Sequence, residues 1–180
     1  MTLNIGDKAV EYSLKNANEE IGGQSLTLEQ SVKENGLVLV FECNHCPYVV
    51  ASVDRMNRMS EYCKSNQIGF VGINSNDASV YANDSFEHMV KRAKNGMPYA
   101  YLYDESQEIA HAYGAKRTPE FFLFNSDNTL VYRGRMDDSP RDPNQASTSE
   151  LKDAIDAMLD GHSPAISETE SIGCSVKWKA

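Results

Sequence analysis

The segment Cys43-Asn44-His45-Cys46-Pro47 carries two cysteines three residues apart. It follows the apolar run Leu37 to Phe41 and precedes a helical pattern that opens with a proline. The thiolate is the reactive form of cysteine, and the free amides and positive dipole end at the start of a helix favour it. A thiol pair at a strand-to-helix junction is therefore typical of disulfide chemistry in an intracellular protein. A buried structural pair, or half of a zinc site, is the alternative.

Composition narrows the classes of partner. The chain has 180 residues and a formal net charge of −9, which predicts one domain with a proper core and disfavours nucleic acid as a partner. No apolar run is long enough to span a membrane, and the N-terminus has no signal-peptide pattern. We therefore expect a cytoplasmic protein that binds neither nucleic acid nor membrane, in a compartment that keeps thiols reduced. No cofactor or metal is expected.

The elements that must position the thiols follow from hydrophobic periodicity and capping signals. The pattern predicts an α/β fold, in which a central mixed sheet is flanked by helices on both faces. Expected elements are a hairpin over residues 9–28, a short helix from 27 to about 35, strands at 37–41, 68–74 and 99–103, helices at 47–63, 85–94 and from a box at 104–107 to Gly114, a hairpin over 120–133, and a last helix from 148 or 149 to 159. Asp84-Ser85-Phe86-Glu87 is interpreted as the capping box of the helix at 85–94.

Several segments together resemble one family. They are Cys43 to Val49, Tyr113-Gly114-Ala115, Thr118 to Phe122, Tyr132-Arg133-Gly134 and Gly173 to Trp178. With the Gly6-Asp7 opening and the N-terminal hairpin, they resemble the redoxin branch of the thioredoxin-like proteins, which includes AhpC/TSA peroxiredoxins and thiol–disulfide oxidoreductases. The resemblance implies a thioredoxin-like fold with an N-terminal β-hairpin extension, a redoxin domain over residues 1–162, and a C-terminal tail over 163–180 packed on it.

Thr118-Pro119 matches the cis-proline that faces the cysteines in thioredoxin-like proteins. The resemblance implies that Thr118 offers its backbone N–H and C=O to an extended substrate. Arg117 would then lie near the sulfurs, where a cation favours thiolate, although a surface salt bridge is nearly as good an interpretation. An ordinary trans proline entering an edge strand is the alternative for Pro119.

The order of attack within the pair is less clear than the pair itself. In ordinary thioredoxins the first cysteine attacks, which would be Cys43. However, thioredoxins place the nucleophile about five residues beyond the aromatic that matches Phe41, and that position is Cys46. Pro47 points the same way, because proline favours the first helical position and so makes Cys46 the N-cap. Cys46 to Val49 also resembles the glutaredoxin Cys-Pro-Tyr-Cys segment, so we predict Cys46 as nucleophile and Cys43 as resolving thiol.

Supporting roles remain open for the neighbouring residues. His45 would hold a thiolate or shuttle a proton, or else face solvent in the loop. Tyr48 would donate to a substrate or pack on the first helical turn. Cys63 falls on the apolar face of its helix and is expected in the core. Cys174 is a candidate third redox thiol, with a packed structural thiol as the default.

The sequence thus predicts a thiol–disulfide oxidoreductase that uses a Cys43/Cys46 dithiol–disulfide cycle. Its partners would be a disulfide-bearing protein, or a small-molecule disulfide or peroxide, together with a cellular thiol reductant. The alternative is a peroxiredoxin-like thiol peroxidase, although Leu39 and Cys43 stand where the peroxiredoxin Pro-x-x-x-Thr/Ser-x-x-Cys pattern has Pro and Thr. A zinc-binding module built on the cysteines with His45 or Cys174, and a redox-inert protein of the same fold, are further alternatives; the former lacks a second ligand pair.

Overall fold

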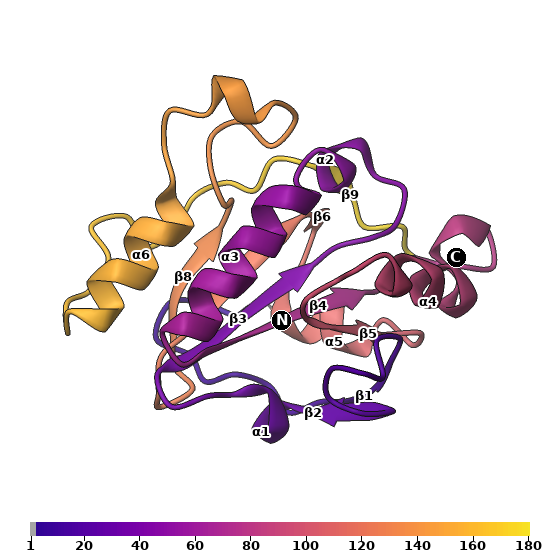
Figure 1. Ribbon diagram of the computed structural model, residues 1–180, viewed down its shortest axis with the longest axis horizontal. Helices are drawn as coiled ribbons and strands as arrows, with labels where there is room; N and C mark the ends of the chain where they lie inside the picture. The colour runs from indigo at the N-terminus through magenta and orange to yellow at the C-terminus, as the bar shows by residue number, and fades with distance from the viewer. Residues whose placement is uncertain (1–2) are drawn as a thin grey trace.

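The computed structural model describes residues 3–180, and its centre is a seven-stranded mixed sheet (Figure 1). The strand order is β2-β1-β5-β4-β3-β7-β8, and the bounds are β1 (Ser13–Asn16), β2 (Ser25–Thr27), β3 (Gly36–Phe41), β4 (Ile68–Asn74), β5 (Ala100–Tyr103), β7 (Glu120–Phe124) and β8 (Leu130–Gly134). Strands β3, β4 and β5 are parallel, whereas β7, β8, β1 and β2 join them as antiparallel pairs. The predicted α/β fold and N-terminal hairpin are confirmed.

Helices cover both faces of this sheet. They are α1 (Leu28–Ser31), α2 (Pro47–Val50), α3 (Val53–Ser65), α4 (Phe86–Lys94), α5 (Glu108–Tyr113) and α6 (Glu150–Leu159), with 3₁₀ turns η1 (Ala82–Asp84) and η2 (Pro143–Gln145). Two short strands, β6 (Arg117–Thr118) and β9 (Cys174–Ser175), pair with each other outside the main sheet. Within residues 3–180, α3 is the longest helix with 13 residues, and none of the helices combines the length and apolar character that a membrane span needs.

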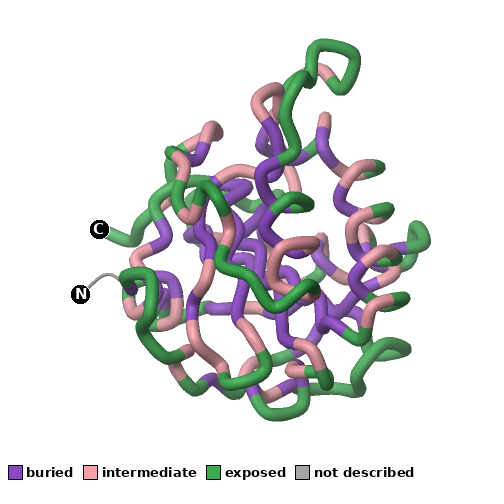
Figure 2. The backbone as a smooth tube through the Cα atoms, turned by 90° about the vertical axis from the view of Figure 1, so that its left-hand side faces the viewer, coloured by how far each residue is buried: buried purple, intermediate pink, exposed green. Residues whose placement is uncertain are grey.

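Strand β3 is the centre of the core because all six of its residues are buried. Its side chains alternate between the two faces, as the pleat of a strand requires. Val38 and Val40 belong to one apolar cluster, together with residues of α3, α4 and α6, while Leu39 and Phe41 belong to the other. Figure 2 shows these buried segments as a central purple mass surrounded by exposed loops. Because both faces of β3 are packed, the carboxyl end of the strand has a fixed position in the core. The cysteine segment begins at that end.

The helix predicted over residues 47–63 is two helices instead of one. It is interrupted at Ala51 and Ser52, between α2 and α3. The Ser52 hydroxyl donates to the carbonyl oxygen of Tyr48 at 2.7 Å and to that of Pro140 at 3.0 Å. Serine that bonds to the preceding turn competes with the regular backbone ladder and bends a helix. Apolar periodicity cannot reveal this break, because the apolar positions continue across it.

The two predicted capping boxes are shifted. Ser85, not Asp84, caps α4, because its Oγ accepts from the His88 amide at 3.3 Å. Asp84 instead turns inward and is fully buried. Helix α5 begins only at Glu108, and the buried Asp104 carboxylate accepts from the amide of Ala110 at 2.9 Å. The short helix α1 keeps its predicted cap at Thr27 but ends at Ser31 rather than near residue 35.

Candidate functional site

The junction between β3 and α2 places the two cysteines side by side. Cys46 is the N-cap of α2 and Pro47 occupies the first helical position, as the sequence predicts. The Cys46 amide donates to the sulfur of Cys43 at 3.3 Å. Both cysteines are almost completely buried, and neither forms a disulfide. The sulfurs therefore lie close together beneath the surface.

Thr118 lies against both sulfurs. Its Oγ1 is 3.6 Å from the Sγ of Cys43, and its carbonyl oxygen is 3.5 Å from the Sγ of Cys46. The bond between Thr118 and Pro119 is cis, as predicted. The structure thus brings Cys43, Cys46 and Thr118-Pro119 together from two distant parts of the chain.

The two thiols differ strongly in acidity. The pKa of Cys46 lies well below that of an ordinary thiol, mainly because the Cys43 thiol donates to its thiolate, and the Cys174 thiol and the amides of Val49 and Cys174 act in the same direction. The pKa of Cys43 lies far above the ordinary value, because of its hydrogen bond to Cys46, its burial and the negative charge of Asp84. These opposite shifts favour the proton on Cys43 and the negative charge on Cys46.

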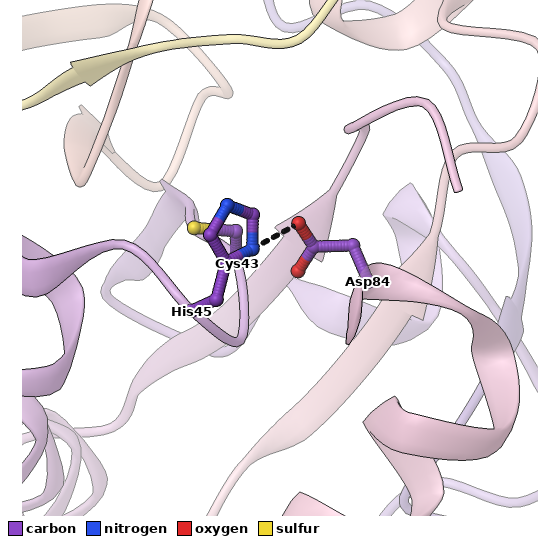
Figure 3. Close-up of side chains that lie close together, drawn as sticks. All are labelled: Cys43, His45 and Asp84. Carbon is purple, nitrogen blue, oxygen red and sulfur yellow. Dashed lines mark ion pairs between the residues drawn. The ribbon is translucent and has the colours of Figure 1, made fainter. Parts of the chain in front are cut away.

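Asp84 is the site residue that sequence reasoning missed (Figure 3). Its Oδ2 lies 2.6 Å from the Nδ1 of His45, and its Oδ1 accepts from the backbone amide of Asn44 at 2.7 Å. Asn74 and Asn76, which end β4 and follow it, donate to the same carboxylate at 3.2 and 3.0 Å. A signal was present, because two asparagines directly after a buried strand are an unusual polar run, but Asp84 itself was assigned to a helix cap.

His45 faces this carboxylate instead of open solvent. Its ring is stacked on that of Tyr81, with centroids 5.9 Å apart. The short contact with Asp84 requires a proton on Nδ1, so in the neutral ring Nε2 is the free acceptor. Asp84 thereby fixes both the orientation and the tautomer of the imidazole.

Within residues 3–180, Cys43, His45 and Asp84 are the only group of three or more His, Cys, Asp or Glu side chains placed closely enough to bind one metal ion. One ligand atom each of Cys43, His45 and Asp84 lies within 4.8 Å of the others. A structural zinc site needs a fourth protein ligand, and both Asp84 oxygens already accept hydrogen bonds. Three side chains are one fewer than a structural zinc site needs, so this group does not by itself complete such a site.

Glu42, next to Cys43, is buried but its charge is balanced. Its carboxylate lies 2.5 Å from the guanidinium of Arg92 and accepts from the Tyr99 hydroxyl at 2.8 Å. Arg92 also donates to the carbonyl oxygen of Cys43 at 3.2 Å. The cysteine segment is thus tied to α4 and to Tyr99 just before β5, and the unbalanced negative charge near Cys43 comes from Asp84.

The other predicted residues, Arg117, Tyr48 and Cys63, have separate environments. Arg117 has an exposed side chain, and within residues 3–180 no ion pair involves it. Tyr48 is half-buried on the first turn of α2, with Arg141 over its ring. Cys63 is completely buried in the core, as predicted, and burial raises its pKa to about 12.

Cys174 reaches the site from the far end of the chain. Strands β6 and β9 are antiparallel, with Thr118 opposite Cys174 and Arg117 opposite Ser175. The backbone edge of Thr118 that the resemblance assigns to an extended substrate is therefore occupied by the protein's own C-terminal segment. This arrangement corrects the expectation that the edge is free.

A central mixed sheet with a thiol pair at the end of its middle strand, facing a cis-proline, defines the class of thioredoxin-like proteins. The Redoxin family model matches residues 5–154, and the chain belongs to this family. None of the curated proteins compared with the chain matches it. Family and fold together support a thioredoxin-like redox function.

Solved structures have the same fold as this chain. An uncharacterized conserved protein of Geobacillus kaustophilus is 39% identical with a TM-score of 0.89, covering 98% of this chain and 93% of that one. A hypothetical protein of Sinorhizobium meliloti 1021 is 33% identical with a TM-score of 0.89, covering 100% and 97%. The C-terminal domain of a Bacteroides thetaiotaomicron protein described as a thiol-disulfide oxidoreductase is 20% identical with a TM-score of 0.62, covering 88% and 97%, and shows likeness of fold alone.

Proposed function

We infer that this protein is a thiol–disulfide oxidoreductase in which Cys46 attacks and Cys43 resolves. The opposite pKa shifts of two thiols that share a hydrogen bond carry the proposal. Cys46 as thiolate attacks a disulfide, one sulfur of which leaves as a thiolate and takes up a proton from solvent, while the other stays bonded to Cys46. Cys43 then loses its proton and attacks the Sγ of Cys46. The second substrate sulfur leaves as a thiol, and a Cys43–Cys46 disulfide has taken up the oxidising equivalents.

His45 and Asp84 supply the proton acceptor that Cys43 needs. Deprotonation of Cys43 is unfavourable at rest because Asp84 and burial raise its pKa. The imidazole, with Nδ1–H on Asp84 and Nε2 free, is the base in this group of three side chains. The Thr118 hydroxyl contacts the Sγ of Cys43, and its carbonyl oxygen contacts the Sγ of Cys46. Tyr48, Arg117 and Pro119 would border the incoming disulfide.

The test uses the Cys174→Ser chain, so that only the pair and the core thiol of Cys63 remain. Reduced protein is mixed with oxidised glutathione or with hydrogen peroxide, and thiol loss and linkage are followed by mass mapping. We expect rapid reaction with the disulfide and a Cys43–Cys46 bond. Adding Cys43→Ser should arrest the protein as a mixed disulfide on Cys46, while Cys46→Ser should abolish the reaction. Cys63→Ser is the control that should change neither rate nor linkage.

Faster reaction with peroxide than with the disulfide would contradict the proposal and favour the thiol peroxidase. Failure of both oxidants to modify Cys46 would exclude either redox enzyme. The physiological reductant is a cellular thiol in this proposal. The cytoplasmic location and the division into residues 1–162 and 163–180 stay predictions.

A further inference from the structure

The C-terminal segment is built onto the site rather than loosely attached. The Val176 amide donates to the carbonyl oxygen of Lys116 at 2.9 Å, and the Val176 side chain is buried. The Lys177 amide donates to Oδ1 of Asn76 at 2.8 Å. The Trp178 ring stacks on that of His111 at a centroid distance of 4.2 Å. Figure 1 shows the yellow segment passing α2 and β6.

Cys174 and Cys46 meet at the same residue. Thr118 is paired with Cys174 across the β6–β9 ladder, while its carbonyl oxygen touches the sulfur of Cys46. Cys174 also packs against the apolar cluster that contains both Cys43 and Cys46. β9 therefore lies along the backbone edge of Thr118 that the resemblance assigns to an extended substrate, with Cys174 beside the cluster that contains both cysteines.

Gly173 makes this approach sterically feasible. A Cβ at Gly173 would lie 2.1 Å from the carbonyl oxygen of Thr118, a distance that no side chain can occupy. Because residue 173 has no side chain, β9 can lie this close to Thr118, and the next residue, Cys174, places a thiol there. Burial and the hydrogen bond with Cys46 raise the pKa of Cys174 to about 11, so this residue is a thiol beside Cys46.

We propose that Cys174 is a third catalytic thiol, which resolves disulfides on Cys46 and so forms a Cys46–Cys174 bond that fastens β9 over the site. This inference rests on the proposed function, because Cys46 must first attack a disulfide. As the Cys174 thiol attacks the Sγ of Cys46, the bond from Cys46 to the substrate sulfur breaks, and the proton of Cys174 passes to that sulfur, which leaves as a thiol. Two protein thiols become one disulfide and one substrate disulfide becomes two thiols.

The Cys46–Cys174 bond can then pass to the inner pair without any further oxidant. Cys43 attacks the Sγ of Cys46, Cys174 leaves as a thiol, and the Cys43–Cys46 disulfide remains. Cys174 is partly exposed, whereas Cys43 is buried. The substrate class that suits the closed site is a small disulfide rather than an extended protein segment, since β9 already occupies the edge of Thr118.

The experiment removes Cys43 and asks whether Cys174 replaces it. Full-length Cys43→Ser is reduced, treated with a slight excess of oxidised glutathione, and digested without reduction for mass mapping. We expect an intramolecular Cys46–Cys174 bond in most of the protein, formed at a rate independent of protein concentration. The matched control moves the thiol by one residue, as Cys174→Ser/Ser175→Cys in the same background. Side chains alternate along a strand, so this thiol should leave Cys46 glutathionylated.

A second variant tests the placement of β9 without touching a thiol. Gly173→Ala in the Cys43→Ser chain should reduce the yield of the Cys46–Cys174 bond by about tenfold or more, because misplaced reacting groups lose their proximity advantage. Arrest of Cys43→Ser at a glutathionylated Cys46 with free Cys174 would overturn this inference and leave the proposed function standing. Equal bonding by a thiol at 174 or 175 would overturn it as well. An unmodified Cys46 in all chains would overturn both proposals.

Discussion

At the scale of single residues, the site shifts the pKa values of two otherwise identical thiols in opposite directions. The pKa of Cys46 is lowered, mainly by its hydrogen bond with Cys43, whereas the pKa of Cys43 is raised by the same hydrogen bond, by burial and by the negative charge of Asp84. In the proposed mechanism, the order of attack follows from these neighbours as well as from the position of Cys46 on α2. Changing one neighbour should change the acidity of one thiol.

The first prediction concerns the acidity of Cys46. Its lowered pKa means that the thiolate persists from alkaline through neutral pH and is lost only when the pH falls through that lowered value. An ordinary thiol would lose it around pH 8.5. In reduced protein labelled with carbon-13 cysteine, the Cβ shift of Cys46 should stay flat across neutral pH and move only in acid. A transition above neutrality would contradict the assigned roles.

The second prediction concerns Asp84. Its charge raises the pKa of Cys43, so Asp84→Asn should let the Cys43 thiolate appear at a lower pH than in the wild type. The Cβ shift of labelled Cys43 on alkaline titration measures this directly. Asp54→Asn, which changes an exposed carboxylate at the start of α3, is the matched control and should have no effect. An unchanged Cys43 titration in Asp84→Asn would mean that the carboxylate does not act on the thiol.

These residues also show what the sequence could predict at this scale. The N-cap position of Cys46 followed from Pro47, because a proline at the first helical position has a local cause. Asp84 could not be found in this way, since its partners come from the β3–α2 junction and the end of β4. The local Ser85-x-x-His88 contact satisfies the cap and leaves Asp84 free to turn inward.

At the scale of elements, Arg55 binds a loop that is distant in sequence and so anchors that loop beside the break between α2 and α3. Its guanidinium donates to the Asp137 carboxylate at 2.8 Å and to the carbonyl oxygens of Ser139 and Pro140, both at 2.7 Å. The Arg55 and Asp137 side chains are 10% and 8% exposed, so this pair is largely removed from water. The loop that follows β8 is therefore fixed beside α2 at Asp137, Ser139 and Pro140.

The third prediction is that Arg55→Ala destabilises the fold. Loss of the guanidinium leaves the Asp137 carboxylate buried without its partner, which should lower the free energy of unfolding by about 2–4 kcal/mol. Urea denaturation measures the change. Arg58→Ala on the exposed side of the same helix should change it by no more than about 0.5 kcal/mol. Equal midpoints for the two variants would show that the loop contact contributes no stability.

Elements were predicted well where the cause is local and less well where it is not. The unbroken apolar run of β3 and the Asn/Asp-rich hairpin turn between β7 and β8 both identify their elements from their own residues. The break at Ser52 depends on Pro140, which lies far along the chain and becomes a neighbour only after folding. The two-residue strands β6 and β9 exist only as partners, so neither has a pattern of its own.

At the scale of the whole molecule, the C-terminal segment connects the cysteine site to the loop after β4 and to the start of α5. Gln107 is central to this connection, because it is buried and its side chain serves three backbone groups. Its Nε2 donates to the carbonyl oxygens of Ser75 and Lys177 at 2.8 and 2.9 Å, and its Oε1 accepts from the Lys179 amide at 3.0 Å. The loop after β4, the start of α5 and the segment following β9 thus share one side chain.

The last prediction follows from this arrangement. Gln107→Ala removes two hydrogen bonds to the segment after β9, which is worth about 2 kcal/mol, or roughly thirtyfold in the local opening equilibrium. Deuterium uptake by a peptide covering residues 174–179 should rise accordingly, and the Cys46–Cys174 bond should form more slowly in the Cys43→Ser background. Glu108→Ala, at the exposed neighbouring position, should leave both unchanged. If Gln107→Ala loosens the segment but the bond forms as fast as before, then Cys174 reaches Cys46 independently of the β9 anchor, and Gln107 has only a structural role.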